Sequence, residues 1–272
     1  MRQLFLLAIF FSSLLLQADP PQITWRIANP RIIKVTQQRL EFEVQVKADQ
    51  SGTYYSSGQI MLYFNNDAIS YSSDLHWTVI PSGISAQTHP DIGNKYAIAS
   101  VRSESYPNVK VLIGLSPTDE DVIDEDPADA YFAEITTEWQ TFVKIQCRIT
   151  DINELAGIYF YVDGTNSQSF YLESPGHEVR YNTPILYESL TLSETYLGRL
   201  YSSSFGWTQY GGTSDNVPYL DWATPVNTSV WEGSPLIDGT DCQAQNLKIH
   251  DGATLSVQSA ARLTVNGVLM LE

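Results

Sequence analysis

Cysteine is scarce in this chain. Its two thiols, Cys147 and Cys242, are too few for the disulfide framework that stabilises many small secreted domains. Positive charge is also scarce, because 15 Lys and Arg residues stand against 31 Asp and Glu residues and give a net charge of −16. A chain with this charge repels a phosphate backbone, so we expect no nucleic-acid partner.

The motifs of common hydrolytic chemistry are missing as well. The sequence has no G-x-S-x-G nucleophile motif, no H-E-x-x-H zinc motif and no glycine-rich phosphate loop that ends in lysine. Its four histidines are scattered, and His250 is expected at the surface because it precedes the turn dipeptide Asp251-Gly252. These absences predict a protein that is not an enzyme.

Apolar residues form one long run, from Leu4 to Leu16, which follows Arg2 and ends shortly before Ala18. The run is shorter than the roughly 20 residues needed to cross a membrane, and its flanks are typical of a secretory signal peptide. We therefore expect residues 1–18 to be removed after Ala18. The mature chain is expected to be secreted or held at the cell surface, without a transmembrane span.

Alternation of apolar and polar residues marks strands along residues 19–185. The clearest run, LEFEVQVK, begins at Leu40, and the same period of two returns in the runs that begin at Phe142 and Ile158. On this period Cys147 lies on the buried face of its strand. Short strands separated by Gly, Pro, Ser and Asn predict an all-β fold, with an antiparallel β-sandwich over residues 19–185.

Two different patterns follow the predicted sandwich. Residues 186–226 combine Ser and Gly with aromatic residues and are predicted to form a linker. Residues 227–272 carry a short repeat, in which leucine recurs every eight residues at Leu247, Leu255, Leu263 and Leu271. This spacing predicts the stacked rungs of a β-solenoid-like segment. Because Glu272 follows the fourth leucine directly, we expect the repeat to continue in a longer protein.

Two stretches resemble known families. The first runs from Leu40 to Ser70 and resembles the opening strands of cohesin-like modules in secreted proteins of Bacteroidetes-type bacteria; it reads LEFEVQVKADQSGTYYSSGQIMLYFNNDAIS. A later strand pair, TFVKIQCRITDINELAGIYFYVDG, extends this likeness over about residues 22–165. The second stretch comprises VNTSVWEG and CQAQNLKIHDGATLSVQSAARLTVNG, and is similar to a segment of large exported proteins, many of which carry a C-terminal sorting domain for type IX secretion. The resemblance implies a cohesin-like, Ig-like jelly-roll sandwich that is displayed or released and is not catalytic.

The two cysteines fall in different predicted segments. An exported protein can oxidise such a pair to a disulfide, but Cys147 also fits the apolar face of its strand as a small buried residue. The sequence therefore leaves open whether Cys147 and Cys242 are joined.

The densest charge lies between Lys110 and Lys144, a stretch without any basic residue. Acidic side chains crowd its centre, and calcium takes about six to eight oxygen ligands from loops of extracellular proteins. The candidate calcium ligands are Asp119, Asp121, Asp124 and Asp126. The alternative is a solvated loop that keeps the protein soluble.

Aromatic residues gather in the sequence where the predicted linker meets the repeat. Flat rings can stack on the faces of sugars while their polar edges stay hydrated. The candidate carbohydrate-binding residues are Trp207, Tyr210, Tyr219, Trp222 and Trp231. The alternative is that these rings pack the linker against the segments on either side of it.

The sequence as a whole favours a non-catalytic structural or adhesion module that belongs to a larger exported protein. Its expected partners are an extracellular polysaccharide or a surface protein, and calcium is the one cofactor that the residues suggest. The alternative function is an accessory or catalytic part of extracellular polysaccharide degradation, because that reaction uses paired carboxylates and the acidic loop is rich in them.

Overall fold

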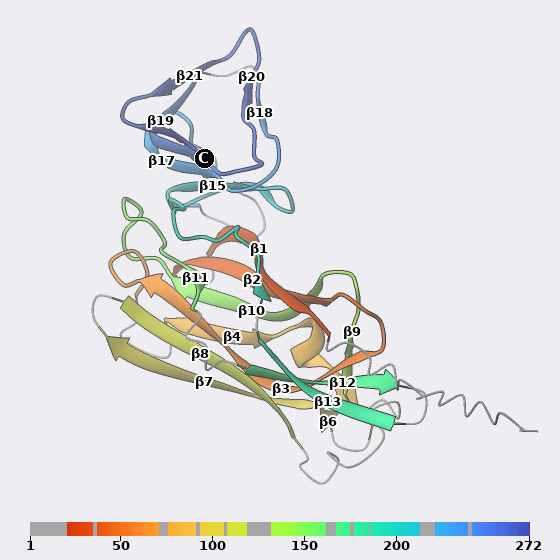
Figure 1. The fold of residues 1–272 in the computed structure, drawn as a ribbon. Coiled ribbons are helices and arrows are strands. Elements are labelled where there is room, and N and C mark those ends of the chain that lie inside the picture. Colours follow the sequence, from red (N-terminus) through yellow and green to blue (C-terminus); the bar gives the residue numbers. More distant parts are fainter. Residues whose placement is uncertain are drawn as a thin grey trace, which may run out of the picture.

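The computed structural model describes residues 21–34, 37–70, 76–90, 93–105, 108–118, 132–161, 167–174, 177–184, 186–212, 221–238 and 241–272. The predicted signal peptide lies outside these residues. The described residues form an all-β protein, in which two sheets make a sandwich and a stack of parallel strands lies beside it (Figure 1). One 3-10 turn, η1 (Gly83–Ala86), is the helical element of the described part, where no helix is long and apolar enough to cross a membrane.

The first sheet of the sandwich has five strands in the order β14-β1-β2-β10-β4. Its neighbouring strands are antiparallel, except for β1 and β14, which run parallel. The strands are β1 (Ile23–Lys34), β2 (Gln38–Ala48), β4 (Trp77–Pro81), β10 (Gln140–Arg148) and β14 (Leu186–Tyr187).

The second sheet has seven strands, and its main path follows the order β13-β12-β3-β8-β7. Two short strands, β9 and β11, also pair with β3, and every pairing is antiparallel. The strands are β3 (Thr53–Asn65), β7 (Tyr96–Ser105), β8 (Asn108–Pro117), β9 (Ala133–Ile135), β11 (Tyr159–Phe160), β12 (Ser167–Ser174) and β13 (His177–Pro184). A separate two-stranded ribbon joins β5 (Thr88–His89) to β6 (Gly93–Asn94).

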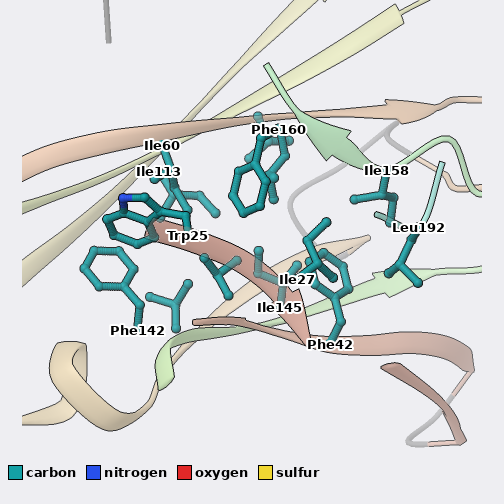
Figure 2. Packing of buried hydrophobic residues seen from close by; sticks show 14 of the residues in the cluster. Trp25, Ile27, Phe42, Ile60, Ile113, Phe142, Ile145, Ile158, Phe160 and Leu192 are labelled. Atoms are coloured by element: carbon teal, nitrogen blue, oxygen red, sulfur yellow. The ribbon is translucent and has the colours of Figure 1, made fainter. Parts of the chain in front are cut away.

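Apolar faces of the two sheets meet in one core, which confirms the predicted all-β fold and its period of two. The apolar residues of β2 that the sequence placed inward are fully buried: Leu40, Phe42, Val44 and Val46. Figure 2 shows Trp25 close to Phe142, and their rings pack edge to face with centroids 4.7 Å apart. Each such side chain contributes about 1.5–3 kcal/mol on burial, so this core stabilises the sandwich.

Parallel strands build the second unit, which we call the coil (residues 199–272). Its main sheet has the order β16-β15-β17-β19-β21, with β22 also paired to β19, and β18 pairs with β20. Apart from the antiparallel pair β15 and β16, these pairings are parallel. The strands are β15 (Arg199–Ser202), β16 (Gly206–Gln209), β17 (Val226–Val230), β18 (Leu236–Ile237), β19 (Asp241–Ile249), β20 (Ser256–Val257), β21 (Arg262–Val265) and β22 (Leu269–Leu271).

The register of the coil corrects the predicted eight-residue rung. Leu247 lies opposite Leu269 and not opposite another leucine of the eight-residue series, while Leu263 lies opposite Cys242. One turn of the coil therefore takes about 20 residues. The eight-residue spacing instead marks successive sides of one turn, because Leu247, Leu255 and Leu263 all pack in the same interior cluster.

The stretch predicted to be a linker, residues 186–226, is built into both units. It supplies β14 to the first sheet of the sandwich and β15 and β16 to the coil. Its apolar residues Leu192, Leu197 and Leu200 are buried in the same core cluster as the sandwich residues. The Ser and Gly content of this stretch predicted a linker. The burial of its apolar side chains explains why it is ordered instead.

Both cysteines are buried, and no disulfide joins them. The Cys147 side chain lies on the inner face of β10, as its strand period predicted, and donates to the carbonyl oxygen of Leu40. Burial raises the pKa of both thiols, which keeps them protonated and unreactive at neutral pH.

Candidate functional site

The outer face of the seven-stranded sheet carries a cluster of tyrosines. Tyr159 lies opposite Tyr63 in the pairing of β11 with β3, and its side chain is 37% exposed. The ring of Tyr63 has its centroid 5.1 Å from that of Tyr159 and 4.6 Å from that of Tyr161. Their strand neighbours Leu62 and Phe160 are buried, so the three tyrosines share the face that points away from the core.

A shallow hollow of about 360 Å³ lies on the three strands β3, β7 and β8 of this sheet. Its lining residues are small or uncharged: Ser57, Gly58, Gln59, Ala99, Gly114, Leu115 and Ser116. Between the hollow and the tyrosines, Met61 lies opposite Leu112. We call this continuous surface, from the hollow through Met61 and Leu112 to the three tyrosines, the tyrosine face.

Gly114 lies in β8, which runs between β3 and β7. Glycine in a strand interior weakens the strand, so it usually has a local reason such as a bulge or a close approach of another backbone. A Cβ atom at Gly114 would meet only the carbonyl oxygens of Ala99 and Gly58, both at 3.9 Å, which is ordinary van der Waals contact. The registers of β3 and β7 with β8 show no shift at this point. Nothing within the described chain therefore requires glycine at this position.

The predicted carbohydrate-binding residues that the structure describes lie in the coil or at its junction with the sandwich. Trp231 is only 1% exposed and its indole nitrogen donates to the carbonyl oxygen of Thr191, so a sugar cannot stack on this ring and the prediction is wrong for it. Trp207 and Trp222 are half-buried and pack edge to face, with centroids 5.0 Å apart and planes at 85°. Two rings in this arrangement do not form one flat platform.

Tyr210 and Tyr219 are the other two candidate rings. Tyr210 is 36% exposed, and Tyr219 lies outside the described residues. Carbohydrate binding by Trp207, Tyr210 and Trp222 stays a prediction.

Arg199 explains how Trp222 is held in place within the coil. The guanidinium carbon lies 3.8 Å from the centroid of the Trp222 ring, so a cation covers this ring. The same fully buried side chain donates to the Gln209 side chain, the Thr228 hydroxyl and the Gln243 carbonyl oxygen. Burial lowers the pKa of Arg199 to about 10, which leaves it charged at neutral pH. The sequence pattern gave no sign of this residue, because a single arginine beside apolar residues has no recognisable spacing.

The predicted calcium ligands cannot be placed. Asp119, Asp121, Asp124 and Asp126 lie outside the described residues, so calcium binding by this loop stays a prediction. Among the residues that are described, no group of three or more His, Cys, Asp or Glu side chains is arranged to hold a metal ion.

A serine and a histidine lie in contact at one end of the sandwich. The Ser70 hydroxyl is 2.6 Å from Nδ1 of His76, and the Arg148 guanidinium is 3.1 Å from Nε2 of the same ring. Arginine can only donate, so Nε2 accepts and the neutral ring carries its proton on Nδ1. His76 therefore donates to the Ser70 oxygen and cannot remove the proton of that hydroxyl, which a nucleophilic serine requires.

His250 is buried, with 3% of its surface exposed, and so the expected surface position is wrong. Its ring lies between the Thr195 hydroxyl at 3.3 Å and the Glu272 carboxylate at 3.4 Å, beside a pocket of about 410 Å³. The Lys248 ammonium donates to Glu194 at 2.5 Å and to Glu272 at 2.7 Å. These contacts pair the charges with one another, and they tie the last turns of the coil to the segment that follows β14.

Comparison with known proteins gives a distant likeness to sandwich modules. No protein-family model and no curated protein sequence matches the chain. The second type II cohesin module of the cellulosomal adaptor scaffoldin ScaA of Acetivibrio cellulolyticus is 11% identical, with a TM-score of 0.33 over 63% of this chain and 94% of that module. A cohesin module of a Clostridium perfringens family 33 glycoside hydrolase is 12% identical, with a TM-score of 0.29 over 62% of this chain and 98% of that module.

A third similar structure is a family 20 exo-β-N-acetylglucosaminidase of Vibrio harveyi. It is 10% identical, with a TM-score of 0.22 over 62% of this chain and 19% of the enzyme. Similarity at this level does not define an activity or a partner for this chain.

Proposed function

We propose that this protein is a non-catalytic extracellular module that binds a partner protein through the tyrosine face. The observation that carries the proposal is Gly114, a glycine in the interior of a strand that packing among the described residues does not require. A partner whose backbone or short side chains approach the sheet closely would explain why this position is glycine.

The chemistry of the face favours a protein as its occupant. Every residue that lines the hollow is uncharged, and the tyrosines Tyr63, Tyr159 and Tyr161 flank it at the far side of Met61 and Leu112. Tyrosine and methionine are enriched in protein interfaces, where charged residues are depleted from the centre. The hollow therefore fits an uncharged segment of a partner protein, with short aliphatic side chains seated over Gly114.

Export of the chain is part of the proposal. It is supported by the signal-peptide pattern of Arg2 and the apolar run Leu4 to Leu16. The resemblance of the tail to segments of type IX secretion substrates favours that export route, and display at the cell surface suits a module whose work is adhesion.

The test uses selection of binding peptides, because the partner is unidentified. A displayed library of uncharged peptides is selected on the immobilised full chain without residues 1–18. The enriched peptides are then measured against Gly114→Leu, which fills the hollow, and against the control Thr78→Leu, which places the same leucine side chain at an exposed position of β4.

We expect peptides that bind the wild-type chain and the Thr78→Leu variant equally and that lose at least tenfold in affinity for Gly114→Leu. Thermal unfolding of both variants checks that each is folded. Selection of peptides that bind all three proteins alike, or selection of none, would show that the tyrosine face is not the docking surface.

A further inference from the structure

The turn of the coil farthest from β15, residues 253–271, is apolar but has no buried residue. It carries a single charged side chain, that of Arg262. Val268, Leu269 and Leu271 are each more than half exposed. Soluble monomers rarely leave apolar side chains together in the open, so this turn has the kind of surface that a partner covers.

The exposed apolar residues of this turn continue the interior of the coil. Residues directly opposite each other in paired strands point to the same side of the sheet. Leu269 lies opposite Leu247, and Leu263 lies opposite Cys242, and both lower residues are buried. In the same way Val265 lies opposite Ala244, Leu271 opposite Ile249, and Val257 opposite Ile237. The upper residues, which we call the end face, are Val257, Leu263, Val265, Leu269 and Leu271.

The backbone of the same turn has an unpaired edge. Among the described strands, β21 and β22 pair with β19 alone, and β20 pairs with β18 alone. Figure 1 shows β20 and β21 on the side of the coil away from the sandwich, where a second molecule can reach them. A strand edge with free amide and carbonyl groups beside apolar side chains is a template for pairing with another strand.

The sequence along this edge is complementary to itself in the reverse direction. An antiparallel pairing of residues 262–272 with the same residues of a second copy, centred on Gly267, sets Leu263 opposite Leu271 and Val265 opposite Leu269. Both pairs are apolar, and all four residues belong to the end face. A two-fold axis reverses the strand direction and therefore produces this antiparallel pairing.

The charges on this edge permit the same pairing. Two copies that each carry a net charge of −16 repel one another, but in this register Arg262 stands opposite Glu272 and the residues between them are uncharged. Glu272 already accepts a hydrogen bond from Lys248 at 2.7 Å, so its position opposite Arg262 avoids repulsion while the apolar pairs supply the affinity.

We propose that two copies of this chain associate through their end faces, with β21 and β22 of one copy paired antiparallel to β21 and β22 of the other. Each copy then covers the open edge of its partner, so the assembly closes at the dimer. This inference is independent of the tyrosine face, which lies on the sandwich.

The experiment is sedimentation velocity of the full chain without residues 1–18, over a hundredfold range of concentration. Leu269→Asp places a charge in the end face, and Arg262→Glu sets like charges opposite each other in the proposed register. Leu236→Asp is the matched control, because Leu236 is as exposed as Leu269 but lies opposite Ser256, while its neighbour Ile237 points inward. Gly114→Leu separates this contact from one made through the tyrosine face.

We expect an equilibrium between monomer and dimer in the wild-type chain. The dissociation constant should rise at least tenfold with Leu269→Asp and at least threefold with Arg262→Glu, and stay unchanged with Leu236→Asp and Gly114→Leu. Thermal unfolding checks that each variant is folded. The inference is overturned by a chain that is monomeric at every concentration, which would leave the end face to another occupant such as a further coil turn. An equal loss with Leu236→Asp, or a loss with Gly114→Leu, also overturns it.

Discussion

Replacing Gly114 by alanine adds one methyl group to the centre of the tyrosine face. The structure predicts that this change has opposite effects on stability and on peptide binding. It lowers the conformational entropy of the unfolded chain, and it narrows the hollow that a partner would fill. The unfolding free energy should therefore rise while affinity for a selected peptide should fall.

The magnitude follows from the surroundings of the new methyl group. Its nearest atoms would be the carbonyl oxygens of Ala99 and Gly58 at 3.9 Å, so no neighbour has to move. Alanine at a compatible glycine position stabilises a protein by about 0.4–1 kcal/mol. In a chain of this size the thermal midpoint should then rise by ~1–4 °C.

Denaturant titration and calorimetry of the variant test this reasoning. Gly83→Ala is the matched control, because its Cβ would lie 1.9 Å from the Thr141 carbonyl oxygen and its φ is +55°. This control should destabilise the protein. A loss of stability in Gly114→Ala would refute the reasoning, since it would mean that the fold itself requires the glycine.

Three further experiments test other parts of the structure. Tyr96→Phe removes a hydroxyl that donates to a carbonyl oxygen of β3 and accepts from the Ala133 amide at 2.8 Å, so it should cost about 1–3 kcal/mol in denaturant titration; no loss would mean that these buried bonds are not made. A hydrogen bond from Lys248 holds the pKa of Glu272 below its ordinary value of 4.5. The stability that this carboxylate contributes is present above about pH 4.5 and is lost as the pH falls through the lower folded-state pKa, so the difference in unfolding free energy between wild type and Glu272→Gln should shrink in acid; a difference that is constant with pH contradicts this. Both cysteine thiols should react with a thiol reagent only after denaturant is added, and reaction of the native protein would show that one of them is accessible.

Local alternation was the reliable signal in this sequence. It predicted the buried faces of β2 and β10, including the position of Cys147, because each strand has one wet and one dry side. The same method misjudged the repeat, since an eight-residue spacing of leucines fits either stacked turns or successive sides of one turn. Strand pairing over about 20 residues decides between these two, and a single sequence does not reveal it.

The candidate surfaces were harder to predict than the fold. Gly114 lies in an apolar run of the sequence. The space around it is known only once the structure places Ala99 and Gly58 beside it. Trp231 was misjudged because its burial depends on how the coil packs on the sandwich.

Oxidative footprinting of the full chain, with and without a selected peptide, tests the proposed docking surface most directly. Hydroxyl radicals modify exposed tyrosine and methionine side chains, and the tyrosine face carries Met61, Tyr63, Tyr159 and Tyr161. Binding should protect these four residues and leave Trp139 and Tyr210 unchanged. Protection of Trp139 or Tyr210 instead, with the four residues modified as in the free protein, would contradict the account.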